Sequence, residues 1–259
     1  MDMESGMNTE REIVLITGAG RGIGAAIADR FIDDGYDVIL NYRRTQGKSA
    51  ANLDKLVAHA EAAGVKAHKA LADVSEVRDI EQMIKKLQAD GIQRIDHLVL
   101  NAATAPFKSI RELTRHDWKE LFGTSLIGNV ACINQVVPLM PPGGTICAIS
   151  GVGSHAVLPN YPLGLMKAAL ENLVRYMDVD LYDKGIRVNG VCGGMVKSEM
   201  LPYLAEIWPG MIQRLESRGR RWALDPVEIA NVVAFLASDR STALRGEILM
   251  ATGGTGLAA

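Results

Sequence analysis

The chain has 259 residues, of which 48% are hydrophobic and 22% are charged, and its formal net charge is −2 at pH 7. This composition is typical of a globular protein with a sizeable core, and the small negative charge excludes an electric field that would gather nucleic acid or an anionic membrane surface. The acidic start of the chain is unlike a signal peptide, and we see no apolar run that would span a bilayer, so we expect a cytoplasmic protein.

After a polar tail, residues 1–11, which we expect to be flexible, short apolar runs alternate with longer amphipathic segments. The predicted strands are Ile13–Thr17, Asp37–Asn41, Val65–Ala70, His97–Leu100, Thr145–Ser150, Arg187–Val191 and Glu247–Met250. Helical periodicity covers Gly24–Asp34, Ser49–Ala63, Val77–Gln88, Glu112–Pro138 and Pro162–Asp183. Apolar strands separated by helices are typical of a parallel sheet covered on both faces. The pattern predicts α/β architecture, with a single doubly wound Rossmann-type sheet over residues 12–259.

The first predicted strand leads directly into a glycine-rich loop, Thr17-Gly-Ala-Gly-Arg-Gly-Ile-Gly24, and helical periodicity begins at the end of that loop. Glycines in this context allow a tight turn and a close approach of the backbone to a pyrophosphate, while the helix N-terminus offers free N–H groups. The loop therefore predicts a dinucleotide site. Its expected members are Thr17, Gly18, Gly20, Arg21, Gly22, Ile23 and Gly24.

The end of the second strand distinguishes between the two nicotinamide cofactors. An acidic residue there would bind the adenosine ribose and repel a 2′-phosphate. This chain instead has Asn41 followed by Arg43 and Arg44, and Arg21 lies in the glycine loop. These guanidinium groups favour NADP(H), because arginine forms strong paired hydrogen bonds with phosphate. The alternative, that the arginines are solvated surface charges, stays open at this stage.

Residues 195–222 depart from the alternating pattern and predict a helical excursion that covers a substrate site. Its apolar members indicate an apolar acceptor: Met195, Met200, Leu201, Leu204 and Trp208. Its arginines suggest attraction for a phosphopantetheine group or an acyl carrier protein: Arg214, Arg218, Arg220 and Arg221. Trp118 and Trp222 are interpreted as packing residues. The cysteines, Cys132, Cys147 and Cys192, are expected to be reduced and buried, and we find no metal-ligand cluster.

Several motifs, in this order along the chain, resemble those of the short-chain dehydrogenase/reductase superfamily. Besides the glycine loop they are Asp73-Val74, Leu100–Ala103, Ile149-Ser150, Lys167–Leu170, Arg187–Gly190 and Ala251–Gly254. The resemblance implies a Rossmann fold, a nicotinamide cofactor and, by analogy, a homo-oligomer, either a tetramer or a dimer. It also implies further cofactor contacts from Asn41, Asp73, Val74, Asn101, Ala102, Ala103, Lys167, Gly193, Gly194 and Val196.

The catalytic groups depart from the usual pattern of that family. Most members have a tyrosine four residues before the lysine, a serine at the end of the fifth strand and an asparagine on the preceding helix. Ser150 and Lys167 fit this pattern, but the tyrosine position holds Leu163 and the asparagine position holds Ser125. Tyr161 is the expected substitute. The expected catalytic residues are Tyr161, Lys167, Ser150 and Ser125.

Tyr161 precedes Pro162, so it should lie at the mouth of the helix and not on its face. One branch of the superfamily, the enoyl-acyl carrier protein reductases, has its tyrosine seven residues before the lysine, against six here. The chain is similar to the NADPH-using members of that branch at Asn101–Ala103, Asn160-Tyr161, Lys167–Leu170 and Val191–Gly194.

Three functions remain open from the sequence. The first is NADPH-dependent hydride transfer to an enoyl thioester or conjugated carbonyl, where the substrate is either a small molecule or an acyl thioester, including one carried on an acyl carrier protein. The second is reduction of a ketone or β-ketoacyl group by the same residues. The third is NADP binding without hydride transfer, or with non-redox chemistry, because Leu163 and Ser125 replace two expected groups. His155, in the same loop as Tyr161, is interpreted as a solvated histidine.

Overall fold

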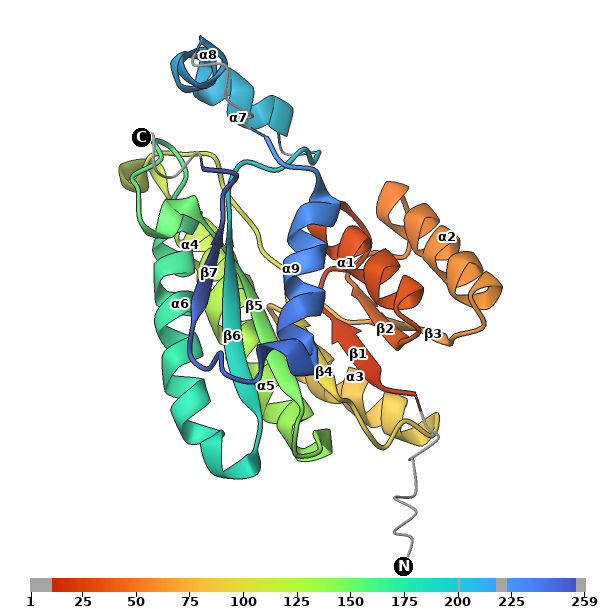
Figure 1. Ribbon diagram of the computed structural model, residues 1–259. Helices are drawn as coiled ribbons and strands as arrows, with labels where there is room; N and C mark the ends of the chain where they lie inside the picture. Colours follow the sequence, from red (N-terminus) through yellow and green to blue (C-terminus); the bar gives the residue numbers. More distant parts are fainter. Residues whose placement is uncertain (1–10, 200, 218–222, 255–259) are drawn as a thin grey trace, which may run out of the picture.

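The computed structural model describes residues 11–199, 201–217 and 223–254, and its centre is a seven-stranded parallel sheet in the order β3-β2-β1-β4-β5-β6-β7 (Figure 1). The strands are β1 Ile13–Ile16, β2 Asp37–Tyr42, β3 Ala67–Leu71, β4 His97–Leu100, β5 Thr145–Gly151, β6 Arg187–Gly193 and β7 Ile248–Ala251. The predicted doubly wound α/β fold is confirmed. Strands β1 to β3 are added toward one edge of the sheet and β4 to β7 toward the other, so the order of strands switches between β1 and β4. Ligands of such sheets bind at the carboxyl ends of the strands, beside this switch point.

Helices cover both faces of the sheet. They are α1 Gly22–Asp33, α2 Lys48–Ala62, α3 Val77–Ala89, α4 Arg115–Phe122, α5 Gly128–Val136, α6 Leu163–Asp180, α7 Leu201–Ile207, α8 Pro209–Ser217 and α9 Pro226–Ala237. The apolar residues of α1, α2 and α9 pack in one core with one face of the sheet, whereas those of α3, α5 and α6 pack in a second core on the other face. Burying strands on both faces explains why they read as continuous apolar runs.

The predicted helix Glu112–Pro138 is interrupted in the structure. Thr114 caps α4 and exchanges hydrogen bonds with Asp117, which fixes the start of the helix at Arg115. A π-helical turn, Gly123–Ile127, then separates α4 from α5. Such turns often mark functional positions inside helices.

One helical run in the described part of the chain, Arg115–Leu139, is long and apolar enough to cross a membrane, contrary to the expectation that no such run exists. However, 56% of its most apolar stretch is buried inside the molecule. This burial is typical of a core helix, and α5 within the run packs against α3.

The excursion between β6 and β7 contains α7 and α8, which stand out from the end of the sheet (Figure 1, light blue). It is therefore helical, as predicted. Met200, Arg218, Arg220, Arg221 and Trp222 lie outside the described residues, as does almost all of the predicted flexible tail. The three cysteines are buried thiols, as expected.

Candidate functional site

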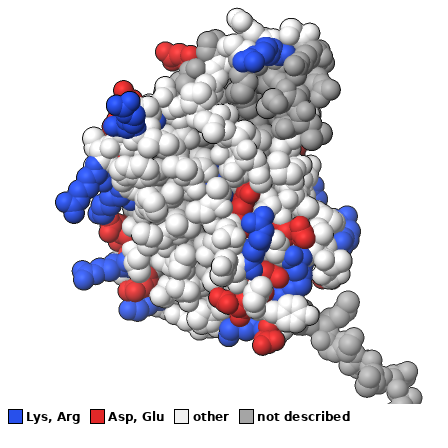
Figure 2. Space-filling model, turned by 90° about the vertical axis from the view of Figure 1, so that its left-hand side faces the viewer, with Lys and Arg blue, Asp and Glu red and all other residues white. Residues whose placement is uncertain are grey.

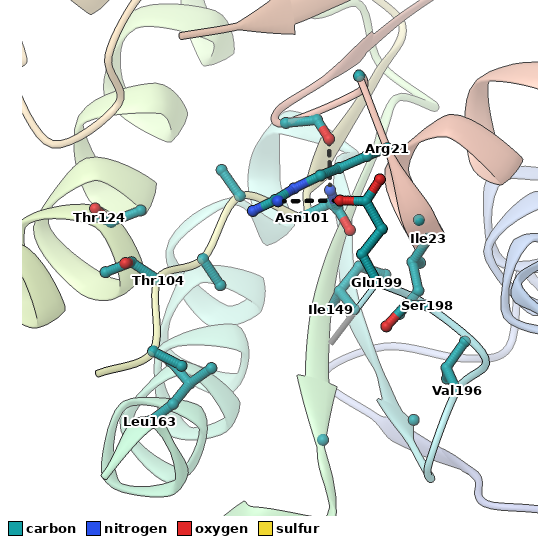
Figure 3. Close-up of a pocket in the computed structure, with 18 of the residues that line it drawn as sticks. Arg21, Ile23, Asn101, Thr104, Thr124, Ile149, Leu163, Val196, Ser198 and Glu199 are labelled. Carbon is teal, nitrogen blue, oxygen red and sulfur yellow. Dashed lines mark hydrogen bonds and ion pairs between the residues drawn. The ribbon is translucent and has the colours of Figure 1, made fainter. Parts of the chain in front are cut away.

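A cavity of about 850 Å³ opens at the carboxyl ends of the strands (Figure 3). Figure 3 shows Leu163, Thr104 and Thr124 along one wall, with Arg21, Glu199 and Val196 across from them. Most residues singled out by the sequence line this cavity: Gly18, Gly20, Arg21, Gly22, Ile23, Asn41, Arg43, Arg44, Asp73, Val74, Asn101, Ala102, Ala103, Ser150, Tyr161, Lys167, Gly193, Gly194 and Val196. Thr17, Gly24 and Ser125 do not line it.

The glycine loop has the shape of a dinucleotide cradle. Gly18 and Gly22 have φ angles of +67° and +52°, which favour glycine. A Cβ atom on Gly24 would lie 2.3 Å from the Gly18 carbonyl oxygen and 2.5 Å from Asn101 Nδ2. Helix α1 begins in this loop and has no side-chain cap, so its first N–H groups are available to a phosphate. These residues fit NADP(H).

Two buried or half-buried asparagines hold the loop in place. Asn41 Oδ1 accepts a hydrogen bond from the Gly18 amide at 3.2 Å, and Asn101 Nδ2 donates to the carbonyls of Thr17 and Gly18 at 2.9 and 3.1 Å. The Thr17 hydroxyl in turn accepts hydrogen bonds from the Asn101 and Ala102 amides. Thr17 and Asn101 therefore support the cradle from behind.

The arginines at the adenosine end differ in their partners. Arg43 lies 3.6 Å from Asp73 Oδ2 and 3.8 Å from Glu120 Oε2, so its charge is already balanced. Arg21 forms a 3.4 Å ion pair with Glu199 across the mouth of the cavity (Figure 3). Among the residues that the structure describes, Arg44 has no ion pair and is exposed. Among these three arginines, Arg44 is therefore the one most available to a 2′-phosphate.

Tyr161 lies before α6, as the following proline predicts. Pro162 is the N-cap residue, and the Tyr161 ring packs edge-on against Trp208, 5.7 Å between centroids, and against Phe107 at 5.9 Å. Burial raises the pKa of the Tyr161 phenol to about 12. Leu163, at the usual tyrosine position, lines the cavity from the first turn of α6.

An aromatic and aliphatic wall surrounds this end of the cavity. Phe107 stacks on Tyr203 with 6.3 Å between ring centroids, and the Trp208 indole donates a hydrogen bond to the Pro159 carbonyl at 2.9 Å. Met195 and Leu204 also line the cavity, as the sequence suggests, whereas Leu201 does not. The wall suits an apolar acyl group. Arg214 is exposed and donates to the Gly210 carbonyl, so nothing directs it toward the cavity.

Lys167 lies one turn into α6 and is buried. Its Nζ donates a 2.5 Å hydrogen bond to the Ile149 carbonyl at the end of β5. Desolvation lowers the pKa of Lys167 to about 8, although the nearby Cys192 and Glu171 act in the opposite direction. A lysine held at the cavity floor in this way is placed to bind the ribose of a cofactor.

A polar cluster centred on Glu171 lies behind Ser150. The Ser150 hydroxyl donates to Glu171 Oε1 at 2.6 Å, and the Ser154 hydroxyl donates to the same oxygen at 2.5 Å. On the other carboxylate oxygen, His155 Nε2 lies 3.0 Å from Glu171 Oε2. Glu171 is buried, whereas the His155 side chain is 51% exposed. The interpretation of His155 as merely solvated therefore misses its partner.

Neither Glu171 nor Ser154 is among the residues that the sequence motifs predicted for the site. One signal was available: Glu171 follows Lys167 by four residues, so both project from the same side of α6. An acid next to a lysine inside an apolar helix indicates a buried polar site.

His155, Glu171 and Cys192 place potential metal-ligand atoms within 4.8 Å of one another. Burial raises the pKa of Cys192 to about 11, so the thiol stays protonated, and the carboxylate already accepts hydrogen bonds from two serines. In this structure the contacts among these residues are those of a hydrogen-bonded cluster.

Ser125 lies in the π-helical turn and is 1% exposed, turned away from the cavity, which Thr124 lines instead. Among the described residues, the hydroxyls of both Thr124 and Ser125 lack a hydrogen-bond partner. The Ser125 carbonyl accepts a hydrogen bond from Asn129 Nδ2 at 2.8 Å. The structure therefore gives Ser125 no contact with the cavity.

The loop after β5 is pressed against the start of α6. A Cβ atom on Gly164 would lie 2.4 Å from the Gly153 carbonyl oxygen, and one on Gly153 would lie 3.1 Å from Gly164 Cα. This glycine pair lets the loop carry Ser154 and His155 up to Glu171.

Comparisons with known proteins agree with this geometry. Residues 18–256 match the family model described as Enoyl-(Acyl carrier protein) reductase. The chain is 35% identical over 255 residues to 1-cyclohexenylcarbonyl-CoA reductase of Streptomyces collinus, covering 96% of this chain and 88% of the relative. It is 30% identical over 243 residues to a 3-oxoacyl-[acyl-carrier-protein] reductase of Staphylococcus epidermidis, covering 93% and 97%. A short-chain dehydrogenase from Burkholderia cenocepacia, solved with NADP, superposes with a TM-score of 0.84 at 26% identity, covering 94% of this chain and 97% of that one.

Proposed function

Because this chain belongs to the short-chain dehydrogenase/reductase family and is an NADP(H)-dependent oxidoreductase, we propose that it reduces an enoyl thioester or a related conjugated carbonyl compound. The observation that carries the proposal is the pairing of Leu163 on α6 with Tyr161 ahead of the helix, both lining the cavity. In a ketone, the oxygen belongs to the carbon that takes the hydride. In an enoyl thioester, the oxygen lies farther along the conjugated system, and a displaced phenol suits that geometry.

The chain's own residues have distinct roles in this proposal. The bound dihydronicotinamide would supply the hydride. Lys167 holds the cofactor ribose, and the Tyr161 phenol donates a hydrogen bond to the oxygen on which negative charge develops. The aromatic wall of Phe107 and Trp208 excludes water from the acyl group and fixes its plane. The names of the matched family model and of the Streptomyces relative support a conjugated acyl substrate.

The test is stopped-flow oxidation of NADPH with a crotonyl-type enoyl thioester and with the matching β-keto thioester. We expect turnover of the enoyl substrate, and a loss of roughly 100-fold in kcat for Tyr161→Phe with unchanged NADPH binding. Tyr176→Phe, on the exposed part of α6, is the matched control and should behave as wild type. Turnover of the keto substrate alone would contradict the proposal.

A second candidate is ketone reduction, which the position of Ser150 on the cavity wall and the 3-oxoacyl reductase relative favour. In that case Ser150 and Tyr161 would polarise one C=O group together, and the same assay identifies this function by turnover of the keto thioester. A third candidate is cofactor binding without hydride transfer. Multiple turnovers of NADPH with either acceptor in the same assay would eliminate it.

We further propose that the face formed by α4, the π-helical turn and α6 pairs with another copy of the chain. Figure 2 shows that the centre of this side of the molecule is free of charged residues. Exposed apolar side chains on these elements include Phe122, Ile127, Leu165 and Val179. A large uncharged, apolar face is typical of an oligomer interface. Light scattering should show a dimer or tetramer, and Leu165→Glu should weaken it.

A further inference from the structure

The Glu171 cluster connects the cavity to the solvent in a way that the proposed reaction does not yet use. Ser150 lines the cavity, Glu171 is buried behind it, and His155 is 51% exposed at the other end. The contact from Ser150 to Glu171 is 2.6 Å long and the contact from Glu171 to His155 is 3.0 Å long, so both are within hydrogen-bond distance. The hydroxyl of Ser150, the carboxylate of Glu171 and the imidazole of His155 are all groups that can accept and release a proton.

We propose that His155, Glu171 and Ser150 form a proton relay that delivers a solvent proton to the substrate oxygen during reduction. This inference rests on the proposed reductase function. Ser150 touches the substrate and is the catalytic end of the relay, while Glu171 and His155 act through it as positioning and proton-supplying residues.

For an enoyl thioester, the substrate gains one hydride from the cofactor and one proton from water. The β-carbon gains the hydride, and the C=C electron pair shifts to form the enolate, whose oxygen takes the Ser150 hydroxyl proton. Glu171, which starts as a carboxylate, takes the proton of the His155 imidazolium and passes it to the Ser150 oxygen, and water reprotonates His155. The enol then returns to the thioester by taking a proton from water at its α-carbon and releasing its O–H proton to water. The net change is the addition of one hydride and one proton to the substrate.

Tyr161 does not fill this role in the present geometry. Burial raises its pKa to about 12, and the Lys167 ammonium, which would lower it, is hydrogen-bonded to the Ile149 carbonyl instead. Tyr161 therefore holds its proton and stabilises the oxygen only as a hydrogen-bond donor.

Groups from α6, from β6 and from the loop after β5 face Glu171. On α6 itself lie the Lys167 ammonium, whose field acts on Glu171, and Arg175, whose guanidinium donates to the Glu171 carbonyl. From β6, the protonated Cys192 thiol faces the cluster, and Ser154 and His155 approach from the loop after β5. Of the residues in this set that contact the carboxylate, His155 is the most exposed.

Glu171→Gln tests the relay because it keeps the shape and the hydrogen-bond acceptor but cannot carry the proton. We expect kcat to fall about 100-fold with both KM values within about twofold of wild type. His155→Gln should lower kcat about tenfold and change the dependence of kcat on pH. His116→Gln, an exposed histidine on α4, is the control and should keep the wild-type pH profile.

Ser154→Ala separates the relay from a structural role, because it removes a hydrogen bond to the same carboxylate oxygen and leaves the chain of contacts unbroken. It should lower kcat less than about fivefold and leave the pH profile unchanged. If Glu171→Gln instead keeps the wild-type kcat, or loses activity only in proportion to its thermal stability with the wild-type pH profile, the relay is wrong.

Infrared difference spectra of the NADP⁺-bound protein supply a readout that needs no turnover. The relay predicts a carboxyl band that changes with pH, is missing in Glu171→Gln and shifts in His155→Gln. A band that is unaffected by His155→Gln would overturn the relay. Absence of turnover with both acceptors would overturn the proposed function instead, and the infrared result would still decide on the proton path.

Discussion

At the glycine-loop end of the cavity, the surface offered to a ligand consists mostly of main chain. Gly18, Gly22 and the first turn of α1 present amide groups, and Asn41 and Asn101 hold that backbone from behind. At the opposite end the surface consists of side chains, Tyr161, Ser150 and Lys167 among them, which come from β5, α6 and the loop between these two elements.

This difference bears on how freely each end can change. A backbone cradle depends on a few glycines with positive φ angles, so it tolerates few substitutions at those positions. A side-chain site can move a function from one position to another, as we propose for Tyr161 in place of Leu163, provided that the scaffold still brings the groups together. Substitutions at the two ends of the cavity should therefore differ in their effects, and the largest effect is expected at Lys167.

Lys167→Met tests the side-chain end. It should lower kcat by roughly 100-fold or more, because the ribose loses its partner. It should also raise thermal stability at pH 7, since Lys167 has a pKa lowered from 10.5 to about 8 by burial. Burying the charged Lys167 ammonium destabilises the folded wild type. Between pH 8 and 10.5 the folded state binds fewer protons than the unfolded state, so this destabilisation disappears as the pH rises from about 8 to 10.5.

Thermal unfolding from pH 7 to 10.5 checks this prediction. The gain in stability of Lys167→Met over wild type should be largest at pH 7, of the order of 3 kcal/mol at most, and should shrink toward pH 10.5. Lys85→Met, on the exposed side of α3, is the matched control. A variant that is less stable than wild type at pH 7 would contradict the prediction.

Gly24→Ala tests the backbone end. Its Cβ would collide with the Gly18 carbonyl and with Asn101 Nδ2, so the loop must shift. Overpacking of this kind costs about 1 to 3 kcal/mol, which corresponds to roughly 10- to 100-fold weaker NADPH binding by fluorescence titration. Gly210→Ala, whose Cβ meets open space, should bind as wild type. Equal affinity of both variants would show that the cradle is not built as described.

Arg44→Ala sharpens the assignment of the 2′-phosphate. We expect about tenfold weaker binding of NADPH with unchanged binding of NADH, because a charge-assisted hydrogen bond is lost only in the first case. Arg43→Ala should have a smaller effect, since that guanidinium is shared between Asp73 and Glu120. The reverse order of effects would assign the phosphate to Arg43.

Glu199→Gln should have the smallest effect. The Arg21–Glu199 pair is exposed, and such pairs contribute little. Freeing Arg21 should tighten NADPH binding by less than about fivefold at low salt, and the gain should vanish as salt rises. Weaker binding by this variant would mean that Glu199 itself supports the cofactor site.

The sequence predicted the backbone end well, because strand, glycine loop and helix are neighbours along the chain. It placed His97–Leu100 correctly and shifted β3 and β7 by only one or two residues. It also placed Tyr161 ahead of α6, since Pro162 restricts the residue before it. Periodicity did not predict the π-helical turn, which leaves the apolar pattern of the surrounding helix almost unchanged.

The side-chain end was predicted less completely. Glu171 takes hydrogen bonds from residues 17 and 21 positions earlier, and that contact depends on the path of the loop after β5. Counting along the chain also placed Ser125 at a catalytic position, but the π-helical turn buries it away from the cavity. Local patterns do not encode such three-dimensional paths.

The contact between Gly153 and Gly164 leads to an expectation about descent. A Cβ at Gly164 would overlap the Gly153 carbonyl oxygen, and a Cβ at Gly153 would crowd Gly164 Cα, so a side chain at either position requires the backbone opposite it to shift, more so at Gly164. Among related sequences that have an acid at the position of Glu171, we therefore expect glycine at both of these positions, and we expect the two positions to co-vary. A lineage that has lost one of them should also have lost the histidine that the loop carries to the carboxylate.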